Sequence, residues 1–312
     1  YHKWYHTQNQ AIIVVGDIDA DKMVERIKAI FSPIKAKENP APYEYYPVPD
    51  NEEAIYIVDK DKEVAQSMMQ VSFKQEPLPM EMRGTQMEII LNYAQSIICD
   101  VVNARLAELA LKENCPFTQA SVSYGKYWVS KTKDAFDVGI VPKSGQDKEA
   151  LQAVMQEIER ASRFGLTGTE VFRAKEEFIS QLEKLYNNRE KQKHNFYTQQ
   201  YVYHFLEGDA IPALETEFQL YKMIAEQLPV EAMNQMLKQM VASTDKNFVV
   251  FSAYPEKEGQ PIPTVEELKA AVAAAKAAEL TPYVDNVKNE PLVPELPAKE
   301  IGRASCRERV LQ

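Results

Sequence analysis

The stretch YHKWYHTQNQAIIVVGDID, residues 1–19, is the most informative part of this 312-residue chain. Within it, residues 11–15 form an apolar, β-branched run that closes on Gly16 and Asp17. This pattern predicts a buried strand that enters a turn. Because a domain does not normally begin with its last core strand, we expect this stretch to be the end of a unit whose earlier part lies upstream.

The same stretch resembles the pitrilysin and insulinase family of zinc metallopeptidases (M16). In that family a helix ending in a Tyr-x-Lys-Trp-Tyr-like run leads through Asn into an apolar strand and Gly-Asp. The matching positions are Tyr1, Lys3, Trp4, Tyr5, Asn9, Ile12, Ile13, Val14, Val15, Gly16 and Asp17. The resemblance implies that the inverted zinc motif, His-x-x-Glu-His with a further Glu ligand, lies upstream. Zn²⁺ would then belong to the parent protein, with none bound by this fragment.

The composition is that of a folded chain without a membrane span. Hydrophobic residues make up 45% of the chain, and no apolar run reaches the roughly 20 residues that a bilayer requires. The net charge of −10 is spread without a block of like charge, which argues against nucleic acid as a partner. The cysteines have no metal-type spacing, and we interpret Cys99 as a small buried hydrophobe.

The residues that follow the opening stretch predict a helix and then a linker. Residues 19–31 should form an amphipathic helix, capped by Asp19, that covers one face of the strand before it. Five prolines in residues 32–53 predict an extended linker. We expect the rings of Tyr43, Tyr45 and Tyr46 to anchor this linker against a domain.

A second unit then shows the order β-β-α-β-β-α-α…β, which is typical of an α+β fold. Strands are predicted at residues 54–58, 67–73, 118–130, 134–141 and 247–254. Helices are predicted at residues 80–112, 148–163, 198–205 and 215–240, and a further long helix starts at a capping box formed by Thr167 and Glu170. The resemblance implies an M16-type α/β roll, a mostly antiparallel sheet with long helices packed on one face. The final strand repeats the pattern of residues 12–16, as expected for a family that repeats this domain.

The chain therefore divides into five predicted segments. They are residues 1–36, a remnant of the preceding catalytic domain; 37–53, a Pro-rich linker; 54–258, a complete non-catalytic M16 domain; 259–300, a helix and extended inter-half linker; and 301–312. The helix in the fourth segment should start at a second capping box, Thr264 and Glu267, and run to about Leu280. The last segment resembles the translation of a sequencing-library adapter, and we interpret it as an artefact.

No residue of the chain is assigned a catalytic, cofactor-binding or metal-binding role. His2 and His6 have the helical i, i+4 spacing of zinc ligands, but no carboxylate lies between them and no third ligand is near, so we interpret them as exposed or stacking residues. The aromatic stretch between His194 and His204 is interpreted as helix packing, with the lining of a peptide-binding chamber as the alternative. Arg105 is interpreted as a structural ion-pair residue, with a substrate clamp as the alternative.

The resemblance implies that the chain is the substrate-chamber portion of a zinc-dependent metalloendopeptidase that hydrolyses peptides. Its partners would be peptide substrates and the remaining M16 domains of the parent chain. The alternative is a non-catalytic scaffold or partner subunit of the same family, and a third hypothesis is an unrelated α+β binding module. The residues themselves do not indicate a cellular compartment. The resemblance adds the expectation of a bacterial cell envelope or periplasmic location.

Overall fold

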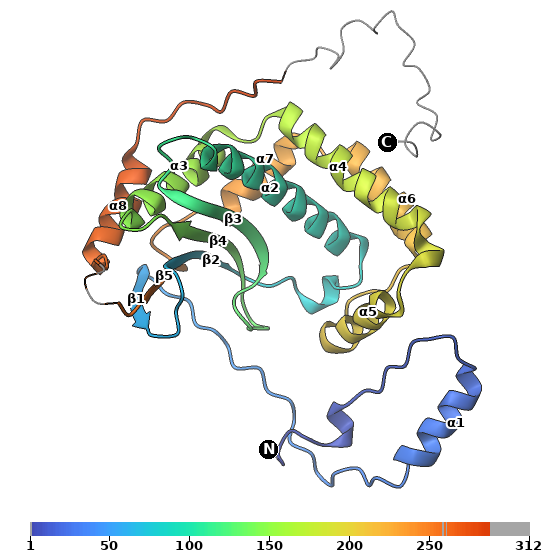
Figure 1. Cartoon of the computed structure of the whole chain (residues 1–312). Coiled ribbons are helices and arrows are strands. Elements are labelled where there is room, and N and C mark those ends of the chain that lie inside the picture. The colour runs from blue at the N-terminus through green and yellow to red at the C-terminus, as the bar shows by residue number, and fades with distance from the viewer. Residues whose placement is uncertain (1, 258, 260, 288–312) are drawn as a thin grey trace, which may run out of the picture.

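A five-stranded sheet lies at the centre of the described part of the chain, which in this computed structural model comprises residues 2–257, 259 and 261–287 (Figure 1). The strands are β1 (Ile55–Asp61), β2 (Met68–Gln75), β3 (Phe117–Lys126), β4 (Asp134–Pro142) and β5 (Phe248–Pro255). Their order is β1-β5-β2-β4-β3. β1 runs parallel to β5 and all other neighbours are antiparallel, which confirms the predicted, mostly antiparallel sheet.

Helices pack on one face of this sheet. The α-helices of the whole described part of the chain are α1 (Ala20–Phe31), α2 (Gln86–Ala110), α3 (Asp147–Phe164), α4 (Gly168–Asn187), α5 (His194–Glu207), α6 (Leu214–Gln227), α7 (Val230–Met240) and α8 (Val265–Ala277). In Figure 1, α2, α3 and α7 lie together beside the sheet. They share one hydrophobic core with the sheet and α8, so the predicted α+β arrangement is confirmed.

The alternation of residues along β2 shows which face of the sheet forms this core. Met69, Val71 and Phe73 belong to the core cluster, whereas Gln70 and Ser72 lie between them in sequence. Successive side chains of a strand point to opposite faces. The helix-covered face is therefore apolar, and the other face of β2 carries polar groups.

Both predicted capping boxes are present, and they fix where two helices begin. The Thr167 side chain accepts a hydrogen bond from the Glu170 backbone N–H, and the Glu170 side chain accepts one from the Thr167 backbone N–H. Thr264 and Glu267 do the same at the start of α8. Each box satisfies backbone donors that a helix N-terminus leaves unpaired.

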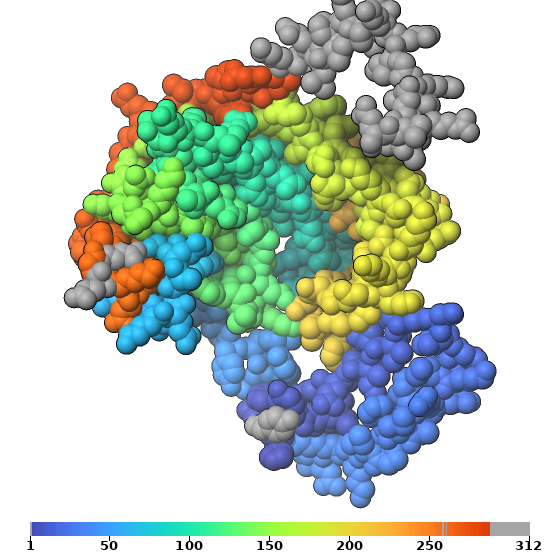
Figure 2. Space-filling view, viewed as in Figure 1, coloured from blue at the N-terminus to red at the C-terminus, as the bar shows by residue number. Residues whose placement is uncertain are grey.

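The predicted strand at residues 11–15 is not formed. These residues have no regular secondary structure, and Ile12 and Val14 are 48% and 44% exposed. A strand is held by backbone hydrogen bonds to its neighbours, and within the described residues no strand pairs with this run. α1 begins after the predicted cap, Asp19, but buries no residue, so the prediction that it covers a strand is also wrong. Figure 2 shows the N-terminal part of the chain, in dark blue, extending away from the sheet.

Of the predicted tyrosine anchors, Tyr45 reaches the sheet unit, where Lys131 Nζ of the β3–β4 turn lies 5.7 Å from its ring centroid. Tyr43, Tyr45 and Tyr46 are 62%, 54% and 74% exposed, so they do not bury their rings against a domain. Tyr43 instead contacts Trp4 and Tyr45, with ring centroids 5.7 and 4.8 Å apart.

Polar contacts near the end of the linker hold it to the sheet. The contacts are Val48 N to Thr132 Oγ1 (3.0 Å), Lys74 Nζ to the Pro49 carbonyl (2.6 Å), Lys133 Nζ to Asp50 (2.7 Å) and Asn51 N to Asn247 Oδ1 (3.1 Å). Each of them joins residues that are distant in sequence. They fix the entry of the chain into β1.

The single helix predicted over residues 215–240 is two helices, α6 and α7. Leu228 has φ −79° and ψ 113°, and Pro229 has φ −78° and ψ 155°, so both residues leave the helical region. Proline lacks the backbone N–H, and its ring disfavours the helical conformation of the residue before it. Pro229 therefore ends α6 and starts α7.

Candidate functional site

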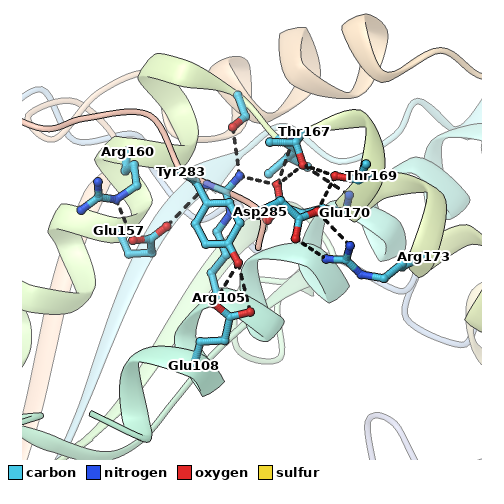
Figure 3. A network of polar contacts seen from close by, with 12 residues as sticks. Arg105, Glu108, Glu157, Arg160, Thr167, Thr169, Glu170, Arg173, Tyr283 and Asp285 are labelled. Carbon is cyan, nitrogen blue, oxygen red and sulfur yellow. Dashed lines mark hydrogen bonds and ion pairs between the residues drawn. The ribbon is translucent and has the colours of Figure 1, made fainter. Parts of the chain in front are cut away.

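A buried arginine connects helices α2, α3 and α4. Arg105 of α2 is 1% exposed. Its Nε and Nη2 donate to the two carboxylate oxygens of Glu170 at 2.6 and 2.7 Å, and Nη2 also donates to the Gly165 carbonyl at 3.1 Å (Figure 3). Nη1 lies 3.5 Å from Oε1 of Glu157. The predicted role of Arg105 as an ion-pair residue is confirmed.

The two carboxylates around Arg105 have different electrostatic environments. Burial alone would raise the pKa of the Glu170 carboxyl, but hydrogen bonds from Arg105 and the Thr167 backbone outweigh it and hold this pKa below its usual value. Burial raises the pKa of the Glu157 carboxyl, although Arg160 and Arg105 counter part of the rise. Glu170, which also belongs to a capping box, is thus the main counterion of Arg105.

A strap, residues 278–287, crosses the same network from the end of α8. The ring of Tyr283 covers the Arg105 guanidinium at 4.3 Å, and its hydroxyl donates to Glu108 at 2.8 Å. Asp285 accepts hydrogen bonds from Arg173 at 2.8 and 3.1 Å. The strap was predicted as part of an extended linker, but its docking on the helices was not.

A cleft of about 500 Å³ lies between α2 and α4, and Tyr283 lines it. Its walls combine apolar side chains with several carboxylates. The lining includes Val101, Ala104, Phe178, Asp100, Glu108 and Glu177. Burial raises the pKa of the Asp100 carboxyl. Arg105 and Arg173 also line the cleft, so its walls carry both charges, and it shows no paired nucleophile and base.

The histidines do not form a metal site in the described residues, where no group of three or more His, Cys, Asp or Glu side chains could hold a metal ion. His2 and His6 precede the short 3₁₀ helix Thr7–Asn9 and are not on one helix, so their spacing does not place them on a common face. His6 is 9% exposed, and its ring nitrogens lie 2.9 Å from Gln8 and 3.3 Å from Asn9. His6 is therefore not exposed, contrary to the interpretation from sequence, whereas His2 is exposed as expected.

The aromatic stretch on α5 is only partly engaged in packing. Phe196 and Tyr197 contact each other with centroids 5.2 Å apart, but Tyr201 and Tyr203 are 43% and 55% exposed. The packing interpretation is therefore wrong for the latter pair. Cys99 is 8% exposed, and burial raises the pKa of its thiol to about 12, which confirms that it is a buried, unreactive side chain.

Comparison with known families identifies the class of protein. A family model described as the peptidase M16 inactive domain matches residues 1–178. The chain therefore belongs to the M16 peptidase family and contains its non-catalytic domain, which excludes an unrelated α+β module. No helix among the described residues has the length and apolar character needed to cross a bilayer.

The chain is also similar to three known proteins. It is 23% identical over 302 residues to a zinc protease PQQL-like protein of Arabidopsis thaliana, covering 95% of this chain and 28% of the relative. The periplasmic protease PqqL of Escherichia coli has a similar fold, with a TM-score of 0.78 at 17% identity, over 93% of this chain and 31% of that one. A predicted insulinase family protease of Yersinia pestis gives a TM-score of 0.68 at 17% identity, over 84% of this chain and 54% of that one. The chain thus spans less than a third of the length of the first two relatives.

Proposed function

We propose that this chain forms part of the wall of the substrate chamber in a zinc-dependent metalloendopeptidase. The observation that carries the proposal is the match of residues 1–178 to the inactive domain of a peptidase family. The similarity of nearly the whole chain to a small part of a zinc protease-like relative supports it. Peptides would be the substrates, and the remaining M16 domains of the parent chain would be the partners.

In this proposal the chemistry belongs to another domain of the parent. A zinc ion held there would supply an activated water for attack on the peptide carbonyl. The present chain would bind and orient the peptide. Its packed core and the buried Arg105 network give it the rigidity that such a wall requires.

The test compares this chain with the parent protein on an unstructured fluorogenic peptide, with and without a chelator. The expected result is chelator-sensitive hydrolysis by the parent and none by the chain alone. Chelator-sensitive hydrolysis that copurifies with the chain alone would contradict the assignment of the chemistry to another domain.

A non-catalytic scaffold or partner subunit is the second candidate, because it too would contain an inactive M16 domain. The upstream coding sequence separates the two: His-x-x-Glu-His supports the peptidase, and its decay supports the scaffold. By analogy with the periplasmic location of PqqL, we also propose a cell-envelope location, which fractionation of the source cells would test.

A further inference from the structure

The sheet face opposite the helices carries a polar strip across β2, β4 and the edge strand β3. In register, Ser72 of β2 lies opposite Asp137 of β4, which lies opposite Ser123 of β3. The next row contains Gln70 and Gly139. Gly139 has no side chain, and a Cβ at this position would lie 3.7 Å from the Ser121 hydroxyl.

Asp137 carries the only formal charge of these two rows. Its Oδ1 accepts hydrogen bonds from Ser72 Oγ at 2.5 Å and from Gln70 Nε2 at 3.1 Å. Ser72 is 2% exposed and Asp137 is half-buried, so the carboxylate is partly desolvated. Burial raises the pKa of this carboxyl, and the two hydrogen bonds counter part of the rise.

No cation of the described residues forms an ion pair with Asp137. Lys74 lies two residues beyond Ser72 on the same face, but its ammonium donates to the Pro49 carbonyl at 2.6 Å. Arg105 shows the opposite situation, with a bidentate carboxylate partner. A partly desolvated charge without a partner is costly, and an incoming cation would offset that cost.

An aromatic pair lies next to Gln70, the residue that donates to the carboxylate. Trp128, in the β3–β4 turn, has φ +53°, and its ring meets that of Phe251 edge to face, with centroids 5.7 Å apart. Phe251 is in register with Gln70, which donates to Asp137. Trp128 is 55% exposed. The pair therefore offers an apolar wall that is separated from the negative charge by Gln70.

We propose that this face binds a lysine or arginine side chain of an extended peptide, with the cationic head on Asp137 and the aliphatic stem against Trp128 and Phe251. A long basic side chain has the required chemistry, because its stem is apolar and its head is charged. An aromatic wall attracts the cation further. The proposal rests on the proposed function and names the class of peptide residue that this wall selects.

The test uses Trp128 as a reporter. The chain contains two tryptophans, so the W4F variant leaves Trp128 as the single fluorophore. The probes are the capped peptide acetyl-Ala-Ser-Lys-Ser-Ala-amide and the same peptide with norleucine in place of lysine. The lysine peptide should bind saturably, and the norleucine peptide at least about tenfold more weakly. Equal binding of the two peptides, or no binding of the lysine peptide at millimolar concentration, overturns the proposal.

Two variants assign the interaction to Asp137. D137N keeps an oxygen that can accept from Ser72 and Gln70 but removes the charge, and we expect about a tenfold loss of affinity for the lysine peptide only. D59N, at an exposed position of β1, removes the same charge elsewhere and should change affinity less than about twofold. Unchanged binding by D137N overturns the proposal.

A second readout covers the case in which D137N folds poorly. W128A changes an exposed residue, and calorimetry should show severalfold weaker binding of the lysine peptide, because the apolar wall is lost. Unchanged affinity in W128A contradicts the proposed site. Binding of the lysine peptide does not depend on the zinc motif of the parent protein. If the upstream sequence lacks that motif, the peptidase assignment fails, but the lysine peptide should still bind.

Discussion

Residues 11–15 and strand β5 are both short, mostly apolar runs, yet their environments are opposite. Val14 is 44% exposed and has no strand partner in the described residues, whereas Val250 is fully buried between β1 and β2. The helices show the same contrast, because α1 has no buried residue and α3 has eight. The pattern of neighbouring residues can specify a helix or favour a strand. Burial of the side chains of that helix or strand requires packing partners that are distant in sequence.

The contrast predicts very different effects for the same substitution in the two runs. V250D places an unpaired charge at a fully buried position, and we expect the sheet unit to lose more than about 4 kcal/mol of stability or not to fold. V14D places the same charge at an exposed position and should change stability by less than about 0.5 kcal/mol. Urea unfolding followed by circular dichroism measures both. Equal destabilisation would show that residues 11–15 are part of the cooperative unit.

Charged residues should show a second, smaller difference. R105M removes the buried guanidinium, which leaves Glu170 without its counterion and Glu157 with Arg160 alone, so we expect a loss of about 3–5 kcal/mol. K22M removes one partner of the exposed Lys22–Asp19 pair at the start of α1 and should leave the unfolding transition unchanged. Denaturant unfolding of the two variants tests this. A loss below 1 kcal/mol in R105M would mean that the network does not hold the three helices together.

Periodicity and capping chemistry were sufficient for much of the fold. The β3–β4 hairpin, α3 and both capping boxes follow from signals within a few residues of each other. The break at Pro229 was missed, although the conformational preference of the residue before a proline pointed to it. The division into α6 and α7 could therefore have been predicted from the sequence around Pro229.

The remaining features depend on pairings across long sequence distances. The Lys74–Pro49 contact, the Tyr283–Arg105 contact and the alignment of Ser72 with Asp137 each require the strand register or the packing of helices. No local pattern encodes which of many lysines or tyrosines takes part. This is why the linker anchors, the strap and the polar strip could not be predicted, whereas the ion-pair role of Arg105 could.

Helix caps should show a third difference, smaller again. T167A removes the side-chain oxygen that caps α4, and we expect a loss of about 1 kcal/mol in the unfolding of the sheet unit. D19A removes the corresponding cap of α1, which buries no residue, so the same transition should not move. Thermal unfolding of the two variants makes the comparison. A shift in D19A would reveal coupling between α1 and the sheet unit that the packing does not show.

The strap should give the smallest effect, and a pH-dependent one. A hydrogen bond from Arg173 holds the pKa of the Asp285 carboxyl below its ordinary value of 3.8. A lowered pKa means that the contact stabilises the strap above about pH 4 and is lost as the pH falls through the folded-state value. Because Arg173 is 48% exposed, the pair should contribute less than about 1 kcal/mol, too little to resolve in global unfolding.

Hydrogen exchange of the backbone amides in residues 281–285, after correction for the intrinsic rate, resolves this local effect. Protection should be present at pH 6 and should fall as the pH drops below 4, whereas D285N should already lack this part of the protection at pH 6 and show no further acid loss from this site. The stacking of Tyr283 on Arg105 does not depend on Asp285, so some protection should remain in the variant. Equal protection in the variant and the wild type at pH 6 would assign the docking of the strap to Tyr283 alone and make its attachment independent of acid.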